Sequence, residues 1–183
     1  MTGDVTIISG PTAVGKGTLV AGLRSRHPEL FVSISATTRT PRPGEIDGVH
    51  YHFVDDAAFD KLIAEDGLLE WAQIHGCTRY GTPRAPVEQA VARGERVILE
   101  IDLRGARQVR EKIPQAKLIF VVPPDMDALL DRLAARGTET PEQVECRLET
   151  ARYELAHQDE FDHIVVNDDL GQATDELVRL IGL

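Results

Sequence analysis

Cysteine is scarce in this chain of 183 residues, where only Cys77 and Cys146 occur. Two residues so far apart exclude a disulfide framework and a cysteine-based metal site, and they favour a reducing compartment. Runs of about 18 apolar residues, which a membrane-spanning helix needs, are also missing. The first residues, Met-Thr-Gly-Asp, lead directly into an apolar segment and leave no room for a signal peptide. We therefore expect a cytoplasmic protein without a membrane partner.

Lysine is also scarce. Only four of the 20 basic residues are lysine, and the other sixteen are arginine. The formal net charge is −10, which argues against nucleic acid as a main partner, since duplex binding needs a basic surface. Arginine presents a planar fork of donors that suits phosphate oxygens. The positions of individual arginines are therefore more informative than their number.

Short apolar segments alternate with amphipathic segments along most of the chain. The predicted strands are rich in β-branched residues and lie at residues 5–8, 97–101, 118–122 and 164–166. The predicted helices lie at residues 17–26, 84–93, 104–112, 126–135, 142–158 and 170–181. Near-continuous apolar strands between helices predict an α/β fold, with a parallel sheet and helices on both of its faces.

Two stretches interrupt this alternation. Residues 33–82 contain a proline-rich segment, an alternating segment and a short helix, which together predict an inserted, mostly β module. Residues 124–154 carry several arginines on two helices with a short linker. We therefore predict a single domain over residues 1–183, in which a core of about residues 1–32, 83–123 and 155–183 carries both insertions.

A glycine-rich segment directly follows the first predicted strand and opens the first predicted helix. Strand, glycine-rich loop and helix are the context of a phosphate-binding P-loop. Backbone N–H groups and the positive end of the helix dipole favour a bound triphosphate, and a lysine adds a point charge. The residues expected to bind ATP are Gly10, Pro11, Thr12, Ala13, Val14, Gly15, Lys16, Gly17 and Thr18.

Position 17 departs from the common form of this loop. That form carries serine or threonine after the lysine, with its hydroxyl on Mg²⁺. Here the residue is Gly17, and the next hydroxyl belongs to Thr18. The sequence therefore leaves Thr18, nucleotide oxygens and water as the ligands for Mg²⁺.

Four blocks of the sequence together resemble guanylate kinases. They are GPTAVGKGT at residues 10–18, SATTRTPRPGE at 35–45 with Tyr51 following, LEWA at 69–72 and VVNDD at 165–169. Residues 132–137 and Arg147 resemble the mobile lid of that family. The resemblance covers nearly the whole chain, and it implies a P-loop NTPase core, a GMP-binding module at residues 33–82 and a helical lid at residues 124–154.

The proline-rich block holds Arg39 and Arg42 three residues apart, on a stiff backbone that can direct both guanidinium groups to one target. The resemblance implies that this target is the phosphate of GMP, which Ser35, Tyr51 and Tyr80 also bind. The loop before Tyr80 is one residue longer than is usual in the family, and Arg79 stands in place of a tyrosine.

Glu70 follows an apolar pair and precedes a tryptophan, which predicts a carboxylate at the boundary of the core. A buried carboxylate needs a partner. Guanine presents a ring N–H beside an amine, two donors that a carboxylate can accept together, whereas adenine presents an acceptor at that ring position. The resemblance implies that Glu70 binds guanine and that Thr82 donates to the guanine carbonyl.

The resemblance also implies roles for polar residues outside the insertion at residues 33–82. Arg132, Arg136 and Arg147 would be the lid cations, and Asn167 would lie near adenine. Asp102 would lie by the guanine and a water network around the metal. Alternation along a strand puts Glu100 and Asp102 on the same side, and a structural role in holding the P-loop is an alternative for either.

The resemblance thus implies an enzyme that moves the γ-phosphoryl group of MgATP directly to GMP, and to dGMP, in purine nucleotide metabolism. Lys16, Arg39 and the three lid arginines would be its catalytic residues. Three alternatives stay open: a non-catalytic guanylate kinase-like binding module, another small P-loop kinase that acts on a phosphorylated sugar, and a stand-alone ATPase. The sequence leaves open whether the protein is a monomer or a homodimer.

Overall fold

The computed structural model describes residues 4–74, 78–135 and 141–183. These residues form two compact units. The first unit contains Met1–Val5, Leu30–Leu99 and Arg104–Ala116, and the second contains Thr6–Glu29, Glu100–Leu103 and Lys117–Leu183. Strands β1 (Val5–Ser9) and β7 (Val97–Glu100) contribute residues to both units.

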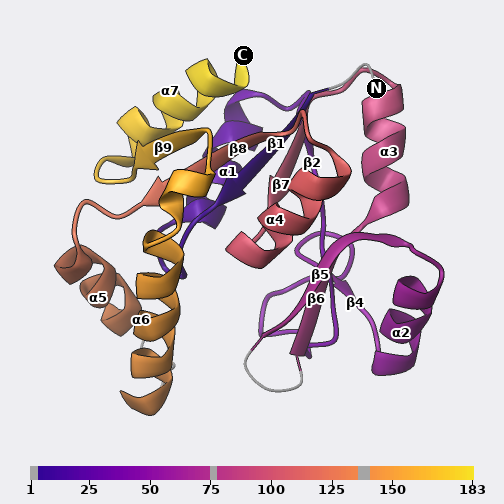
Figure 1. The fold of residues 1–183 in the computed structure, drawn as a ribbon, viewed down its shortest axis with the longest axis horizontal. Coiled ribbons are helices and arrows are strands. Elements are labelled where there is room, and N and C mark those ends of the chain that lie inside the picture. Colours follow the sequence, from indigo (N-terminus) through magenta and orange to yellow (C-terminus); the bar gives the residue numbers. More distant parts are fainter. Residues whose placement is uncertain (1–3, 75–77, 136–140) are drawn as a thin grey trace. The chain divides into compact units, whose positions relative to one another are not determined.

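Parallel strands form the sheet of the second unit (Figure 1). Strand β1 pairs with β8 (Lys117–Val122), from Thr6 opposite Lys117 to Ser9 opposite Phe120, and β8 pairs with β9 (His163–Val166). All of β1 is buried, and so is β8 after its first residue. Strands covered on both faces are apolar along their length, which accounts for the near-continuous apolar sequences of these two strands.

The helices of the second unit are α1 (Lys16–Arg26), α5 (Met126–Ala135), α6 (Pro141–Leu155), the short 3₁₀-helix η1 (Gln158–Glu160) and α7 (Leu170–Ile181). Helix α1 packs on α7, and Arg26 donates to Asp175 at 2.7 Å. Helix α7 begins after Asp169, whose carboxylate accepts from the third residue of the helix, and it ends at a glycine with φ of 81°. Helices α5 and α6 also pack on each other.

The first unit contains a small mixed sheet with the strand order β4-β3-β6-β5. Strand β3 (Ala36–Thr37) pairs in parallel with β4 (His52–Phe53) and antiparallel with β6 (Thr78–Pro83), which pairs antiparallel with β5 (Leu68–Ile74). Strand β2 (Phe31–Val32) pairs in parallel with β7. The helices are α2 (Asp56–Ala64), α3 (Arg84–Ala92) and, from its second residue on, α4 (Leu103–Lys112).

Phe59 joins α2 to this small sheet. Its side chain is fully buried and packs with Ala36 of β3 and Leu68 of β5. Full burial of one such side chain contributes roughly 1.5–3 kcal/mol. Helix α2 and the sheet therefore form one packed body, and the residues on β3 and β6 are held in place relative to α2.

The predicted α/β class with a parallel sheet is confirmed, and most predicted elements agree with the structure to within one residue at each end. The helix predicted over residues 142–158 is wrong at its C-terminal end, because α6 ends at Leu155. An α-helix would pair the N–H of His157 with the carbonyl of Tyr153. Here that N–H donates to the carbonyl of Glu154 at 3.1 Å, and the imidazole of His157 binds the carbonyl of Tyr153 instead. Within the described ranges, no helix combines the length and apolarity that crossing a bilayer requires.

Candidate active site

The phosphate-binding loop lies between the end of β1 and the start of α1 at Lys16. Gly10 has φ of 142° and Gly15 has φ of 100°, values that residues with side chains rarely adopt. A Cβ atom on Gly10 would lie 2.2 Å from the carbonyl oxygen of Val121, and one on Gly15 would lie 2.5 Å from Nδ2 of Asn167. The fold of the loop itself therefore requires both glycines. They place the first turn of α1, which attracts anions, directly after the loop.

Lys16 is the first residue of α1, and its side chain lies across the loop. Its ammonium group donates to the carbonyl oxygens of Gly10 and Pro11, to the latter at 3.1 Å. An ammonium carries three donors and a full charge, so it can exchange carbonyl oxygens for the phosphate oxygens of a nucleotide. The positive charge predicted from the sequence is thus held at the loop.

Arg132 reaches the loop from α5. One of its terminal nitrogens donates to the carbonyl of Val14 at 3.1 Å, and the other donates to the carbonyl of Asn167 at 2.8 Å. Asn167, only 6% exposed, donates from Nδ2 to the same Val14 carbonyl at 2.8 Å. The structure therefore brings a predicted lid residue and the predicted adenine-site residue together at one carbonyl of the loop.

A second predicted lid arginine also contacts the loop. Arg147, on α6, donates to Oγ1 of Thr12 at 3.1 Å. Arg136, the third predicted lid arginine, lies outside the described residues. Lys16, Arg132 and Arg147 bring three positive charges to one short segment, an arrangement that can stabilise the charge of a triphosphate.

Glu100, the last residue of β7, faces the start of α1. Its two carboxylate oxygens lie 3.7 and 3.9 Å from the position that a Cβ atom on Gly17 would take. Burial raises the pKa of the Glu100 carboxyl, and the nearby charge of Lys16 opposes that rise. Thr18 is exposed on α1, and Asp102 directly precedes α4. The common P-loop has a hydroxyl at the position after the lysine. Here that position is Gly17, and the structure places the carboxylate of Glu100 beside it.

In the first unit, Arg39 lies among aromatic side chains. Its Nε donates to the hydroxyl of Tyr80 at 3.2 Å, and its guanidinium carbon lies 5.4 Å from the ring centre of Tyr51. The rings of Tyr51 and Tyr80 meet edge to face, with their centres 5.8 Å apart. Three residues predicted to bind one phosphate are therefore in contact, and we call them the Arg39 cluster. The loop before Tyr80 is one residue longer than usual, and the hydrogen bond between Arg39 and Tyr80 is consistent with the prediction that Tyr80 belongs to the phosphate site.

Ser35 and Arg42 are less closely joined to the Arg39 cluster. The carbonyl of Ser35 accepts from the N–H of His52 at 2.9 Å, so its backbone pairs with β4. Arg42 is exposed. Within the described ranges, neither side chain hydrogen-bonds to Arg39.

Glu45 is a further residue of this site, with no role predicted from the sequence. Its Oε1 accepts from Arg39 at 2.8 Å, and its Oε2 accepts from the backbone N–H of Arg42 at 2.7 Å. The bond from Arg39 is the main cause that lowers the pKa of Glu45 to about 2. The sequence shows a glutamate near the two arginines, but the partners of that glutamate depend on a turn that the pattern does not specify.

Replacing Glu45 by glutamine should lower the free energy of unfolding at neutral pH and much less in acid. A carboxyl whose folded pKa is about 2, below its ordinary value of 4.5, stabilises the fold above the ordinary value and loses that contribution as the pH falls toward 2. Urea unfolding of both proteins at several pH values measures the effect. The difference between them should shrink as the pH falls from roughly 5 to 3. A constant difference would show that the ion pair is not its cause.

Glu70, on β5, is the buried carboxylate that the sequence predicted. It is 5% exposed, and the fully buried Thr82 on the paired strand β6 donates its hydroxyl to Oε1 at 2.6 Å. A hydroxyl has a single proton. The proton of Thr82 is therefore directed at Glu70, and one carboxylate oxygen has a fixed partner.

Helix α4 supports the same stretch of β5, with side chains that the sequence did not predict to contact it. Gln108 accepts from the N–H of Trp71 at 3.2 Å and donates to the carbonyl of Trp71 at 2.8 Å, as a neighbouring strand would. Lys112 donates to the carbonyl of Leu69 at 2.6 Å. The backbone is thus held on both sides of Glu70. No sequence signal marks these residues, because a polar residue on a helix is ordinarily solvated.

A P-loop nucleotide-binding protein is defined by a strand, a glycine-rich loop and a helix that bears a lysine. This chain has all three, and arginines from other helices contact its loop. The family model described as guanylate kinase matches residues 2–182. The chain belongs to the guanylate kinase family.

Individual relatives agree with this assignment. The chain is 59% identical over 184 residues to the guanylate kinase of Cutibacterium acnes, across 100% of this chain and 92% of that relative. It is 56% identical over 177 residues to the guanylate kinase of Thermobifida fusca, across 97% of this chain and 90% of that relative. The crystal structure of guanylate kinase from Anaplasma phagocytophilum superposes with a TM-score of 0.82 at 29% identity, over 99% of this chain and 85% of that one. The predicted family and enzyme class, a guanylate kinase, are confirmed.

Shikimate kinase from Bacteroides thetaiotaomicron shares the fold alone. Its structure superposes with a TM-score of 0.53 at 12% identity, over 98% of this chain and 99% of that one.

Proposed function

We propose that this protein transfers the γ-phosphoryl group of ATP directly to GMP, and to dGMP, in the purine nucleotide metabolism of the cytoplasm. The observation that carries the proposal is the buried carboxylate of Glu70, with its fixed hydrogen bond from Thr82, in a chain of the guanylate kinase family. A buried carboxylate with a fixed hydrogen-bond partner can discriminate sharply between a base that presents donors and one that does not.

On the donor side, the loop and the first turn of α1 would bind the phosphates of ATP. Lys16, Arg132 and Arg147 already contact the loop, so small movements would exchange loop oxygens for phosphate oxygens. Phosphoryl transfer needs little covalent chemistry from the protein, and catalysis depends on alignment of the two nucleotides and on neutralised charge. Asn167, by its place beside Gly15, would lie near the nucleotide bound to the loop.

On the acceptor side, the Arg39 cluster would bind the monophosphate of GMP, with Arg42 and Ser35 as further donors. Glu70 would accept from the ring N–H and the amine of guanine. The proton of Thr82 points at Glu70, so it would have to turn away before Thr82 could donate to the guanine carbonyl. The role expected of Asp102 beside guanine is kept as part of the proposal.

Mg²⁺ would accompany ATP in this reaction, where it neutralises charge on the phosphate oxygens. The described residues contain no group of three or more histidine, cysteine, aspartate or glutamate side chains that could hold a metal ion. That finding fits Mg²⁺, which keeps several waters and uses phosphate oxygens with one or two carboxylates. Glu100, which faces Gly17, would supply that carboxylate, and Thr18 is the nearby hydroxyl. The residues present therefore fit the ion.

Replacing Glu100 by glutamine should weaken binding of ADP in the presence of Mg²⁺ by about 10-fold, since a lost metal-associated carboxylate typically has an effect of that size. Binding of ADP without the metal should change little. Calorimetry with and without Mg²⁺ measures both values. If the two affinities fall equally, Glu100 supports the loop and does not act through the metal.

The stretches at residues 33–82 and 124–154 would close over the substrates as the GMP-binding module and the lid. Closure would exclude water, which would otherwise accept the phosphoryl group and waste ATP. Their boundaries stay predictions.

A coupled assay of ADP production with GMP, dGMP, AMP, CMP and UMP tests the proposed function. GMP and dGMP should be used, and AMP should react about 10⁴-fold less efficiently, as is usual for a site built to bind a polar group that the analogue lacks. Equal use of AMP would contradict the proposal. Production of ADP at the same rate without any acceptor would indicate a stand-alone ATPase.

A further inference from the structure

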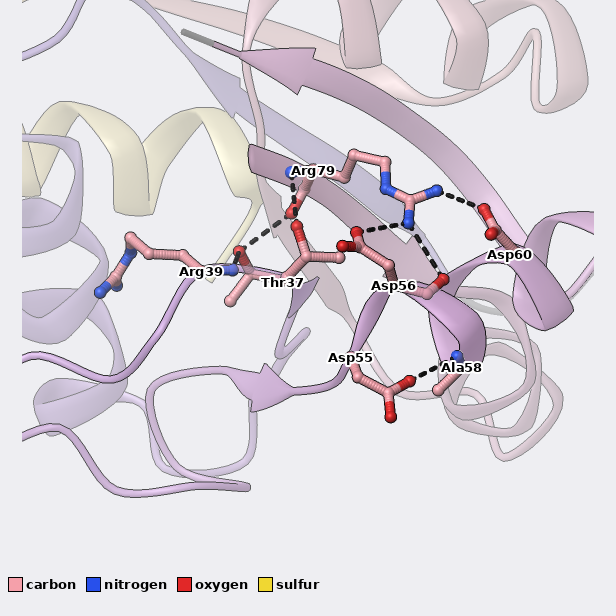
Figure 2. A network of polar contacts seen from close by, with 8 residues as sticks. Thr37, Arg39, Asp55, Asp56, Ala58, Asp60 and Arg79 are labelled. Carbon is pink, nitrogen blue, oxygen red and sulfur yellow. Dashed lines mark hydrogen bonds and ion pairs between the residues drawn. The ribbon is translucent and has the colours of Figure 1, made fainter. Parts of the chain in front are cut away.

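The side chain of Arg79 is anchored to the start of α2 (Figure 2). One terminal nitrogen donates to Oδ1 of Asp60 at 2.5 Å, and the other donates to Oδ1 of Asp56 at 2.7 Å and to its carbonyl oxygen at 3.0 Å. The guanidinium carbon also lies 4.8 Å from the ring centre of Phe59, the residue that packs α2 on the sheet. The side chain is only 13% exposed, and both terminal nitrogens face α2. Arg79 is therefore not placed to bind a phosphate itself.

The backbone of Arg79 is bound to β3 and the residue that follows it. Its carbonyl oxygen accepts from Oγ1 of Thr37 at 2.9 Å and from the N–H of Thr38 at 3.0 Å, and its N–H donates to Oγ1 of Thr38 at 3.0 Å. The same Thr37 hydroxyl oxygen, fully buried, accepts from the N–H of Arg39 at 3.2 Å. A continuous path of hydrogen bonds thus runs from α2 through Arg79 and Thr37 to the backbone of Arg39.

The next residue of β6 holds the side chain of Arg39. Successive residues of a strand point to opposite faces, so Arg79 turns toward α2 while Tyr80 presents its hydroxyl to Nε of Arg39 at 3.2 Å. Figure 2 shows the side chain of Arg39 extending away from Arg79. Strand β6 therefore holds the guanidinium of Arg39 directly, through Tyr80, and its backbone indirectly, through the bond from Thr37 to Arg79.

We propose that Arg79 is a positioning residue for phosphate recognition. Its double ion pair with Asp56 and Asp60 fixes β6 against α2 and, through Thr37 and Tyr80, sets the direction in which Arg39 meets the monophosphate. A single exposed ion pair contributes little, but a planar fork held by two acids and a ring has one fixed orientation. The inference rests on the proposed role of Arg39 in binding the phosphate of GMP.

The test compares nucleotide and nucleoside binding. Arg79→Met removes the ion pairs and keeps apolar contact with Phe59, and Asp60→Asn weakens the same anchor from the side of α2. By calorimetry, we expect Arg79→Met to lower the affinity for GMP about 10-fold, which corresponds to the loss of about one hydrogen bond to the phosphate. Asp60→Asn should lower it less. The affinity for guanosine, which has no phosphate, should stay unchanged in both.

Two further measurements separate positioning from general stability. In an Arg39→Met background, Arg79→Met should have a much smaller effect on GMP affinity than in the wild type, because the proposed path acts through Arg39 and leaves only the contact of Tyr80 to be changed. Arg84→Met is the matched control, since Arg84 is also partly buried and pairs with Asp66 at 2.8 Å in the same unit. It should lower thermal stability and keep the ratio of GMP to guanosine affinity.

Equal losses of GMP and guanosine affinity in Arg79→Met, or an additive effect in the Arg39→Met background, would overturn the positioning role. If the wild-type protein binds GMP no more tightly than guanosine, the phosphate site of the proposed function fails, and this inference fails with it.

Discussion

Replacing Lys16 by methionine is expected to abolish phosphoryl transfer and to leave GMP binding nearly intact. Methionine keeps an unbranched side chain of similar length but removes the charge and all three donors. A cation on the transferring phosphate acts where charge develops, and its loss should lower kcat by about 10³-fold or more. Lys16 is not among the residues proposed to bind the acceptor nucleotide, so the affinity for GMP should change little. Coupled kinetics and calorimetry with GMP measure the two effects.

Lys61→Met is the matched control for this experiment. Lys61 lies on α2, its side chain is largely exposed, and its partner Glu65 is 3.8 Å away in an i,i+4 pair that contributes little. Its replacement should leave transfer at the wild-type rate. The free Lys16→Met protein loses the two bonds to the loop carbonyls, so its thermal unfolding should be compared with that of the wild type. Full transfer activity in Lys16→Met would mean that Lys16 lies outside the transfer site.

Replacing Glu70 by glutamine is expected to remove most of the preference for guanine. The amide is the same size, but it accepts at only one of its two polar atoms, whereas the proposed contact with guanine and the bond from Thr82 require acceptors at both. One donor would then face another donor in a buried site. The kcat/KM for GMP should fall about 10²-fold or more, because hydrogen bonds to a buried charge and unpaired buried groups have effects of that size. Use of AMP should change much less.

Glu88→Gln serves as the control for this second experiment. Glu88 lies on α3, is exposed, and is 3.7 Å from Arg84. Its replacement should keep the wild-type ratio of GMP to AMP use. If Glu70→Gln also keeps that ratio, Glu70 is a structural partner of Thr82 and another group reads the base.

Local patterns predicted the phosphate-binding loop well, because the loop depends on residues close in sequence. Gly10 and Gly15 have the positive φ values that a tight glycine-rich turn needs, and Lys16 begins the helix that follows. The partners of the loop were not predictable in the same way. Arg132 and Asn167 meet at the carbonyl of Val14 from 118 and 153 residues away, and only the packing of the second unit decides which atoms they reach.

The first unit shows a second limit of sequence reasoning. The sequence predicted a mostly β module here, but strands β3 and β4 have two residues each, too few for a sequence pattern to give their bounds. Arg79 was visible only as a departure from the family pattern. Its anchors, Asp56 and Asp60, lie on a helix whose position depends on the burial of Phe59. Glu70 was predictable because its apolar neighbours indicated burial, and a buried carboxylate needs a partner.

Transfer of label from [γ-³²P]ATP tests the central claim most directly. With unlabelled GMP and Mg²⁺ present, the account predicts that the label appears in GDP, at its terminal phosphate, and that no labelled GDP forms without GMP. Little inorganic phosphate should be released, since closure around the substrates excludes water. Label that appears as inorganic phosphate at the same rate with or without GMP, and never in GDP, would contradict the account.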